Sequence, residues 1–206
     1  RRSRSAILRV RRNLVQPDSL HPLVAQILKD RDADCALIAH GSLADQSAGQ
    51  QDLALTAEEW SINGISPVLF AEAIASSMVR AGHGTLGVIG SVAGDRGRKS
   101  NYVYGAGKGM ITRYVQGLQH RLAGTEVAVI LIKPGPTRTP MNAHLGDSGP
   151  SLADVAKVAA TIVSGMEKRR SIVYALLLYP SDAADELCRV ARVGCSTLHI
   201  IIPPNS

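Results

Sequence analysis

The chain has 206 residues, 45% of them apolar and only 3% aromatic, and its formal net charge is +6. This length suits one substantial core better than two domains. No apolar run reaches the roughly 18 residues that span a bilayer, and no apolar segment of a secretory signal follows the basic start of the chain. We therefore expect a single cytoplasmic domain over residues 1–206.

The positive charge is concentrated at the start of the chain. Six arginines lie within the first twelve residues, and without them the formal net charge is zero. The basic arm, residues 1–5, could contact phosphate or anionic lipid, but we expect a solvated segment without a specific partner. No basic face remains for nucleic acid. Cys35, Cys188 and Cys195 form no CxxC pair and the histidines lack ligand spacing, so we expect neither disulfides nor a metal site.

Short β-branched segments alternate with longer helical ones along the chain. In chain order the sequence predicts a strand at Ala6–Val10, a helix at Asp18–Asp30 with Pro22 in its first turn, a strand at Cys35–Ala39, a helix at Thr56–Ala81, a strand at Leu86–Gly90, a helix at Ser100–Ala123, a strand at Val127–Ile132, a helix at Ser151–Lys168, a strand at Ile172–Leu178 and a helix at Ser181–Val193.

Two helix starts carry a capping signature, Thr56-x-x-Glu59 and Ser151-x-x-Asp154. The strands are apolar without polar alternation, which indicates a mainly parallel sheet covered on both faces. The fold class is α/β, doubly wound. The C-terminal tail, residues 198–206, begins with the apolar run Leu198–Ile202, and both a membrane contact and a further strand remain open for it.

Three residues suggest chemistry. Ser91 precedes Tyr104 by thirteen residues, and Lys108 follows Tyr104 by four. On one helix, the i,i+4 spacing puts Tyr104 and Lys108 on the same face. A nearby ammonium eases the deprotonation of a phenol, and a serine hydroxyl at the same spot could hold a carbonyl or alcohol oxygen. This arrangement suits proton transfer coupled to hydride transfer.

Two glycine-rich segments imitate nucleotide-binding motifs. Gly82-x-Gly84-x-x-Gly87 has the letters of the dinucleotide fingerprint, but its glycines end a helix and lead into a strand, so we expect a structural turn. Ala106–Gly109 lacks the leading glycine and the Ser or Thr of a phosphate loop, and we reject it.

From about Leu8 to Leu178 the chain resembles the short-chain dehydrogenase/reductase family. The resemblance rests on Ser91, on Tyr104-x-x-x-Lys108 and on the downstream turn Pro134–Thr139. It implies that Tyr104 is the general acid/base, that Lys108 lowers the Tyr104 pKa and binds the nicotinamide ribose, and that Ser91 positions the substrate oxygen. Asn63 would support a water relay to the lysine.

The resemblance also implies NAD or NADP as cofactor, without deciding between them. The Asn13-Leu14 pair takes the place of an Asp-Val pair that contacts adenine. The implied cofactor-binding residues are Asn13, Leu14, Ala39, His40, Gly41, Tyr104, Lys108, Pro134, Gly135, Thr137 and Thr139. His40 is expected as a position of close backbone approach and not as a catalyst.

Ile38–Gly41 replaces the family's usual Asn-Asn-Ala-Gly. Together with IAHGSLADQ and SVAGDRGRKSNYVYGAGK, it makes the chain most similar to polyprenylphospho-ketopentose reductases. This implies a small-molecule or lipid-linked sugar substrate and a peripheral membrane contact. Arg96, Arg98 and Arg138 could meet a substrate phosphate, although solvated loop arginines are the expectation. The family's usual dimer or tetramer face would be formed by Thr56–Ala81 and Ser100–Ala123.

The family's first strand, Gly-rich turn, helix and second strand find no match before Ala6. Without these elements, Cys35–Ala39 is expected to become an exposed apolar edge. Two hypotheses follow: a nicotinamide-dependent oxidoreductase, or a non-catalytic remnant that cannot bind the dinucleotide. A nucleic-acid binder acting through the basic arm ranks last.

Overall fold

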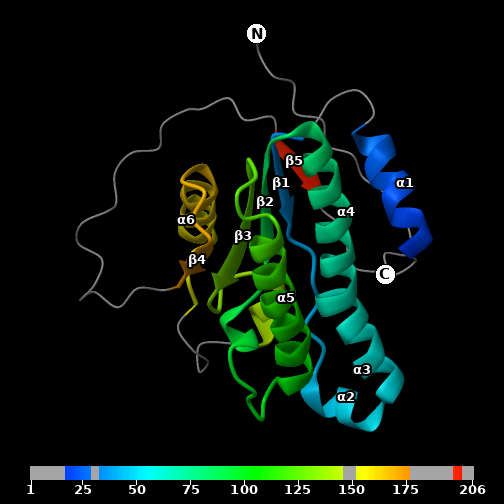
Figure 1. Cartoon of the computed structure of the whole chain (residues 1–206). Coiled ribbons are helices and arrows are strands. Elements are labelled where there is room, and N and C mark those ends of the chain that lie inside the picture. The colour runs from blue at the N-terminus through cyan, green and yellow to red at the C-terminus, as the bar shows by residue number, and fades with distance from the viewer. Residues whose placement is uncertain (1–16, 29–32, 146–151, 177–196, 201–206) are drawn as a thin grey trace.

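The computed structural model describes residues 17–28, 33–145, 152–176 and 197–200. Its strands are all parallel and form one sheet in the order β4-β3-β2-β1-β5. They are β1 (Cys35–Ile38), β2 (Gly84–Ile89), β3 (Val127–Pro134), β4 (Ile172–Ala175) and β5 (Thr197–Ile200). A parallel sheet with flanking helices (Figure 1) confirms the expected Rossmann-like α/β class.

Helices cover both faces of this sheet. The α-helices are α1 (Pro17–Ile27), α2 (Gln46–Gln51), α3 (Leu53–Trp60), α4 (Ser66–Ala81), α5 (Tyr102–Arg121) and α6 (Val155–Glu167). A π-helical turn, Ser61–Ile65, joins α3 to α4, and 3-10 turns occupy Val92–Gly94 and Pro140–Leu145. In Figure 1, α4 and α5 lie on one face with α1 beside α4, whereas α6 lies on the other face.

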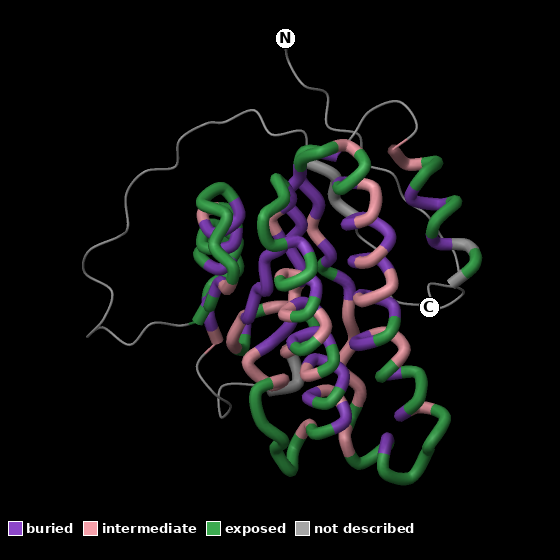
Figure 2. The backbone as a smooth tube through the Cα atoms, viewed as in Figure 1, coloured by how far each residue is buried: buried purple, intermediate pink, exposed green. Residues whose placement is uncertain are grey.

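The core consists of two apolar clusters, one on each face of the sheet. Successive strand side chains point to opposite faces, so Val129 and Leu131 of β3 pack with α4 and α5, whereas Ile130 and Ile132 pack with α6. Figure 2 shows the resulting buried positions along the strands and along the inner sides of the helices. Burial on both faces explains why the strands show no polar alternation.

The starts of three helices differ from the sequence prediction. The capping box at Thr56 is wrong: α3 begins at Leu53, and the Asp52 carboxylate caps it by accepting from the amides of Ala54 and Leu55. Thr56 lies inside the helix and donates its hydroxyl to the Gly49 carbonyl. The first described helix begins at Pro17, so Pro22 lies in its second turn and not in its first.

The expected helix start and capping signature at Ser151 are wrong as well. Helix α6 begins at Val155, and Asp154 is its N-cap, because its carboxylate accepts from the Lys157 amide. Asp154 is therefore not the third residue of a helix capped by Ser151, which itself lies outside the described residues. The strand Ala6–Val10 and the helix Ser181–Val193 also lie outside them.

The expected exposed edge at Cys35–Ala39 is wrong. Strand β5 pairs in parallel with β1, with Cys35 opposite Thr197 and Ile38 opposite Ile200. The apolar run that begins at Leu198 therefore starts as a strand of the sheet. Of the two alternatives for the tail, this is the further strand. Pairing satisfies the backbone groups of β1 that an open edge would leave to solvent.

The structural interpretation of the glycine-rich turn is confirmed. Gly82 ends α4 in a left-handed conformation, with φ 79°, and β2 begins two residues later. This is a helix C-cap that favours glycine, and no helix starts after it to receive a pyrophosphate.

We predict that Gly94→Ala destabilises the protein. An added Cβ would lie 2.6 Å from the carbonyl carbon of Lys108 and 2.7 Å from its oxygen, so the turn after β2 would be pushed away from α5. Overpacking of this kind costs about 1–3 kcal/mol. Chemical denaturation should show that loss, while Gly97→Ala, which meets nothing within 4 Å, should change little. Equal stability of the two variants would contradict this packing.

Candidate functional site

The residues singled out from the sequence meet where β2 ends and α5 begins. Ser91 lies just after β2, and its side chain caps the turn Val92–Gly94 by accepting from the Ala93 amide at 3.1 Å. Tyr104 is the third residue of α5, and its phenol has the Ser91 hydroxyl as a hydrogen-bond partner. The carboxyl ends of parallel strands are the usual place for ligands in such sheets.

Lys108 lies one helical turn after Tyr104 and is almost completely buried, with 3% of its surface exposed. Its ammonium donates to the carbonyl of Ile89 at 3.2 Å and lies 5.7 Å from the centre of the Tyr104 ring. The i,i+4 spacing therefore brings the phenol and the ammonium together on one helix face, as predicted.

Burial dominates the electrostatics of these two groups. It lowers the pKa of Lys108 to about 8, while the negative charge of Glu59 acts in the opposite direction. Burial also raises the pKa of Tyr104, and the negative charge of Glu59 acts in the same direction. The hydrogen bond with Ser91 lowers this pKa, but the net direction is upward. The expected lowering of the Tyr104 pKa by Lys108 is thus not seen in this geometry. At neutral pH the phenol is protonated and the lysine is mostly charged.

Asn63 lies in the π-helical turn between α3 and α4 and is fully buried. Its oxygen accepts from the Ser42 amide at 3.0 Å, and its nitrogen donates to the Ser42 hydroxyl at 3.2 Å and to Glu59 at 3.0 Å. The π-turn packs closely on α5. A Cβ added at Gly107 of α5 would lie only 3.1 Å from the Cβ of Asn63. A π-turn of this kind often marks a functional site.

Sequence reasoning missed Glu59 as a member of this site. Its carboxylate is buried and accepts from the hydroxyl of Ser42 at 2.6 Å as well as from Asn63. The local pattern suggested a helix cap instead. The signal in the sequence that could have identified Glu59 is its i,i+4 spacing from Asn63, because residues four apart on a helix lie on the same face.

Three cofactor-binding residues are expected directly after β1. Two of them, His40 and Gly41, are buried or partly buried and lie near the ammonium of Lys108. The imidazole of His40 meets the Ser66 hydroxyl at 2.9 Å and packs edge-on against Phe70. Burial, aided by the charge of Lys108, lowers its pKa to about 4, so the ring is neutral. At Gly41, a Cβ would lie 2.9 Å from the Asn63 oxygen and 3.4 Å from the Lys108 nitrogen. Ala39 is exposed.

The turn after β3 is held by its own hydrogen bonds. The Gly135 amide donates to the Ala175 carbonyl at 3.0 Å, and the Thr137 hydroxyl donates to the Gly135 carbonyl at 3.0 Å. The Thr139 hydroxyl reaches the Thr137 carbonyl at 3.4 Å. Both hydroxyls still have oxygen lone pairs that can accept. Pro134 is the last residue of β3, and Asn13 and Leu14 lie outside the described residues.

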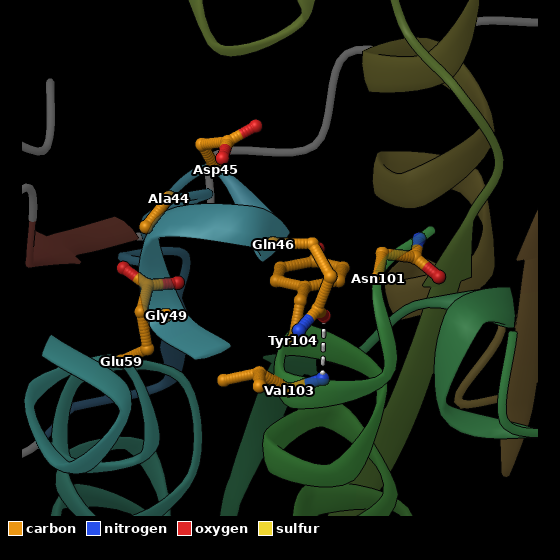
Figure 3. Close-up of a pocket in the computed structure, with 8 residues that line it drawn as sticks. All are labelled: Ala44, Asp45, Gln46, Gly49, Glu59, Asn101, Val103 and Tyr104. Carbon is orange, nitrogen blue, oxygen red and sulfur yellow. Dashed lines mark hydrogen bonds between the residues drawn. The ribbon is translucent and has the colours of Figure 1, made fainter. Parts of the chain in front are cut away.

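A pocket opens beside Tyr104, between α5 and the segment that precedes α3 (Figure 3). Tyr104 and Val103 line it from α5, Gln46 and Gly49 from α2, and Glu59 from α3. Its lining is mixed, because five of the eight lining residues have polar side chains while most of the surface that faces the pocket is apolar. The arrangement combines a buried cation, a phenol with a hydroxyl partner, and an adjoining pocket.

Residues 4–149 match the family model described as short chain dehydrogenase. Two curated relatives from strains of Mycobacterium tuberculosis, both described as uncharacterized oxidoreductases, are 35% identical over 115 residues, which is 55% of this chain and 46% of each relative. An uncharacterized oxidoreductase of Streptomyces coelicolor is 28% identical over 163 residues, 78% of this chain and 63% of that protein. The chain thus spans less than two thirds of the length of these relatives.

Solved structures show the same fold. A short-chain dehydrogenase from Sphingobium yanoikuyae in complex with NADPH aligns with a TM-score of 0.69 at 22% identity, over 79% of this chain and 65% of that one. A 3-oxoacyl-[acyl-carrier protein] reductase from Brucella melitensis in complex with NAD aligns with a TM-score of 0.68 at 20% identity, over 81% and 75%.

We predict that Glu59→Gln lowers the free energy of unfolding by about 1–3 kcal/mol, because one of the two donors on the carboxylate would then face an amide NH2. Glu58→Gln, at the exposed neighbouring position, is the matched control and should stay within about 0.5 kcal/mol of the wild type. Urea unfolding measures both. An unchanged midpoint for Glu59→Gln would show that the buried network contributes nothing.

Proposed function

Because the chain belongs to the short-chain dehydrogenase family, we propose that it is an oxidoreductase that interconverts a carbonyl and a secondary alcohol with NAD or NADP. The observation that carries this proposal is the meeting of Ser91, Tyr104 and Lys108 at the end of β2. The curated relatives described as oxidoreductases and the solved structures with NADPH and NAD support it.

Tyr104 is the general acid in the direction of reduction. Its raised pKa keeps the phenol protonated at neutral pH, so a proton is available for the carbonyl oxygen of the substrate. Ser91 shares a hydrogen bond with that phenol and would hold the same oxygen. In the direction of oxidation, Tyr104 takes the proton back from the alcohol.

Lys108 and Asn63 support this chemistry from the buried side. Lys108 would hold the ribose hydroxyls of the cofactor with its ammonium, which lies 5.7 Å from the centre of the Tyr104 ring. Asn63 is held rigidly by Ser42 and Glu59, so it keeps its place beside the segment that follows β1. We keep for Asn63 the role of supporting a water relay to Lys108.

The nicotinamide end of the cofactor fits the donors of this site. An ammonium has three N–H groups, and Lys108 gives one of them to Ile89, which leaves donors for ribose hydroxyls. When bound, the cofactor supplies or accepts the hydride at the carbonyl carbon. The residues that would hold it are Ala39, His40, Gly41, Tyr104, Lys108, Pro134, Gly135, Thr137 and Thr139.

As substrate we propose a keto sugar, carried on a polyprenyl phosphate. The support is the similarity of the segments around His40 and Tyr104 to reductases of such sugars. Arg96, Arg98 and Arg138 are exposed and could contact the phosphate. Among the described residues one continuous helical stretch, Leu53–Ala81, is long and apolar enough to span a membrane, but 56% of its apolar window is buried in the protein. It is therefore best explained as a core helix, and we propose a cytoplasmic protein.

One observation favours a second candidate, a non-catalytic member of the family. Strand β5 pairs with β1 on the side where the family's first strand would lie. A chain with this arrangement would keep Ser91, Tyr104 and Lys108 without the usual dinucleotide cradle.

We further propose a homodimer or homotetramer formed through the helices after β1 and β2. Large apolar side chains are exposed on α3, α4, α5 and the π-turn, namely Trp60, Ile65, Val79 and Met110. Association through these helices would remove such side chains from water. Sedimentation velocity at about 50 µM should give a dimer or a larger species, and a monomer would count against this face.

Tyr104→Phe tests the proposed chemistry. We expect it to lower kcat by about 100-fold or more, the usual contribution of a general acid, while the affinity for NADPH or NADH stays within about twofold by calorimetric titration. Tyr102→Phe, at an exposed position of the same helix, should leave both values unchanged. Turnover retained in Tyr104→Phe would refute its role. No heat from the wild type at millimolar cofactor would favour the non-catalytic candidate.

A further inference from the structure

The pocket beside Tyr104 contains a hydrogen-bond donor that has no partner among the described residues. Gln46, the first residue of α2, reaches across to α5, and its carboxamide oxygen accepts from the Val103 amide at 3.1 Å. Figure 3 shows this bond at the wall of the pocket. The contact also fixes the orientation of the carboxamide, because a backbone N–H requires the oxygen and not the NH2 group.

The NH2 group of Gln46 is buried and has no partner within the described part of the chain. Leaving a buried donor unsatisfied costs about 1–3 kcal/mol, and such groups are uncommon enough to require an explanation. Gln46 lines the pocket together with Tyr104. A ligand atom that accepts a hydrogen bond would satisfy the donor.

We propose that Gln46 is a specificity-determining residue that contacts the substrate and donates to an uncharged oxygen, a hydroxyl next to the reacting carbon. This inference rests on the proposed function, because it takes Tyr104 as the group that meets the reacting oxygen. It adds a second point of contact in the neighbouring pocket.

The charges around the pocket decide which kind of oxygen it accepts. Its ionisable acidic side chains are Asp45 and Glu59, and no lysine or arginine lines it. A phosphate or carboxylate would be repelled there. A hydroxyl both accepts and donates, so it can accept from Gln46 and donate to a carboxylate or amide oxygen of the lining. A sugar or other polyhydroxylated carbonyl compound has this chemistry.

An unpaired buried donor lets a site discriminate between a substrate that carries a hydroxyl and an analogue that lacks it. A site that binds a substrate hydroxyl rejects the analogue without it, because the buried donor is then left unpaired. From the cost of one unsatisfied neutral donor, we expect a preference of about 10-fold for a 2-hydroxyketone over the matching ketone.

The experiment compares two pairs of probes, acetoin with 2-butanone and hydroxyacetone with acetone. The chain has a single tryptophan, Trp60, whose indole N–H donates to the carbonyl of Val103 at 3.1 Å. Since Val103 lines the pocket, the fluorescence of Trp60 reports binding without turnover. The variant is Gln46→Leu, and the matched control is Gln50→Leu, at an exposed position of the same helix.

We expect the wild type and Gln50→Leu to bind each hydroxyketone about 10-fold more tightly than its partner, and Gln46→Leu to bind both within about twofold. Equal affinities in the wild type, no response to any probe, or a preference that survives in Gln46→Leu would overturn the inference. If Gln46→Leu does not fold, the side-chain amide NMR signals of wild-type Gln46 decide: they should shift with acetoin and not with 2-butanone.

This binding experiment separates the two proposals. A preference that depends on Gln46, in a protein that binds no cofactor, would leave the pocket assignment standing and the oxidoreductase proposal refuted. Cofactor binding and turnover without the preference would give the opposite result.

Discussion

The site depends on the burial of one positive charge. Lys108 lies inside the protein with its ammonium on the Ile89 carbonyl and the negative charge of Glu59 in its surroundings. Removing an ammonium from water costs several kcal/mol unless it finds partners. The close approach of α5 to β2 and to the π-turn supplies these partners, because glycines such as Gly107 let the backbones come together.

The same packing fixes the other members of the site. The π-turn points Asn63 inward, where Ser42 and Glu59 hold it, and the first turn of α5 sets Tyr104 beside Ser91. Glu59 belongs to both parts of the site. Its charge acts on the buried ammonium of Lys108, and its side chain lines the pocket that also contains the NH2 group of Gln46. Among the residues that line this pocket there is no lysine or arginine.

Much of the fold could be predicted from the sequence because its signals are local. The apolar strands, the long helices and the Tyr104–Lys108 spacing follow from periodicity alone. The failures come from contacts that are distant in sequence. The local sequence around Glu59 has the pattern of a capping residue, whereas its hydrogen-bond partner Ser42 lies 17 residues away. The pairing of β1 with β5 joins segments at opposite ends of the chain, and α2 is too short, at six residues, to show a periodic pattern.

The balance between burial and compensation at Lys108 can be measured directly. The 13C chemical shift of its ε-carbon, assigned by comparison with Lys108→Met, reports the charge of the amine as a function of pH. The account predicts a titration midpoint at about 8. A midpoint near the ordinary value of about 10.4 would mean that burial does not outweigh the compensating charge of Glu59, and would contradict this account of the site.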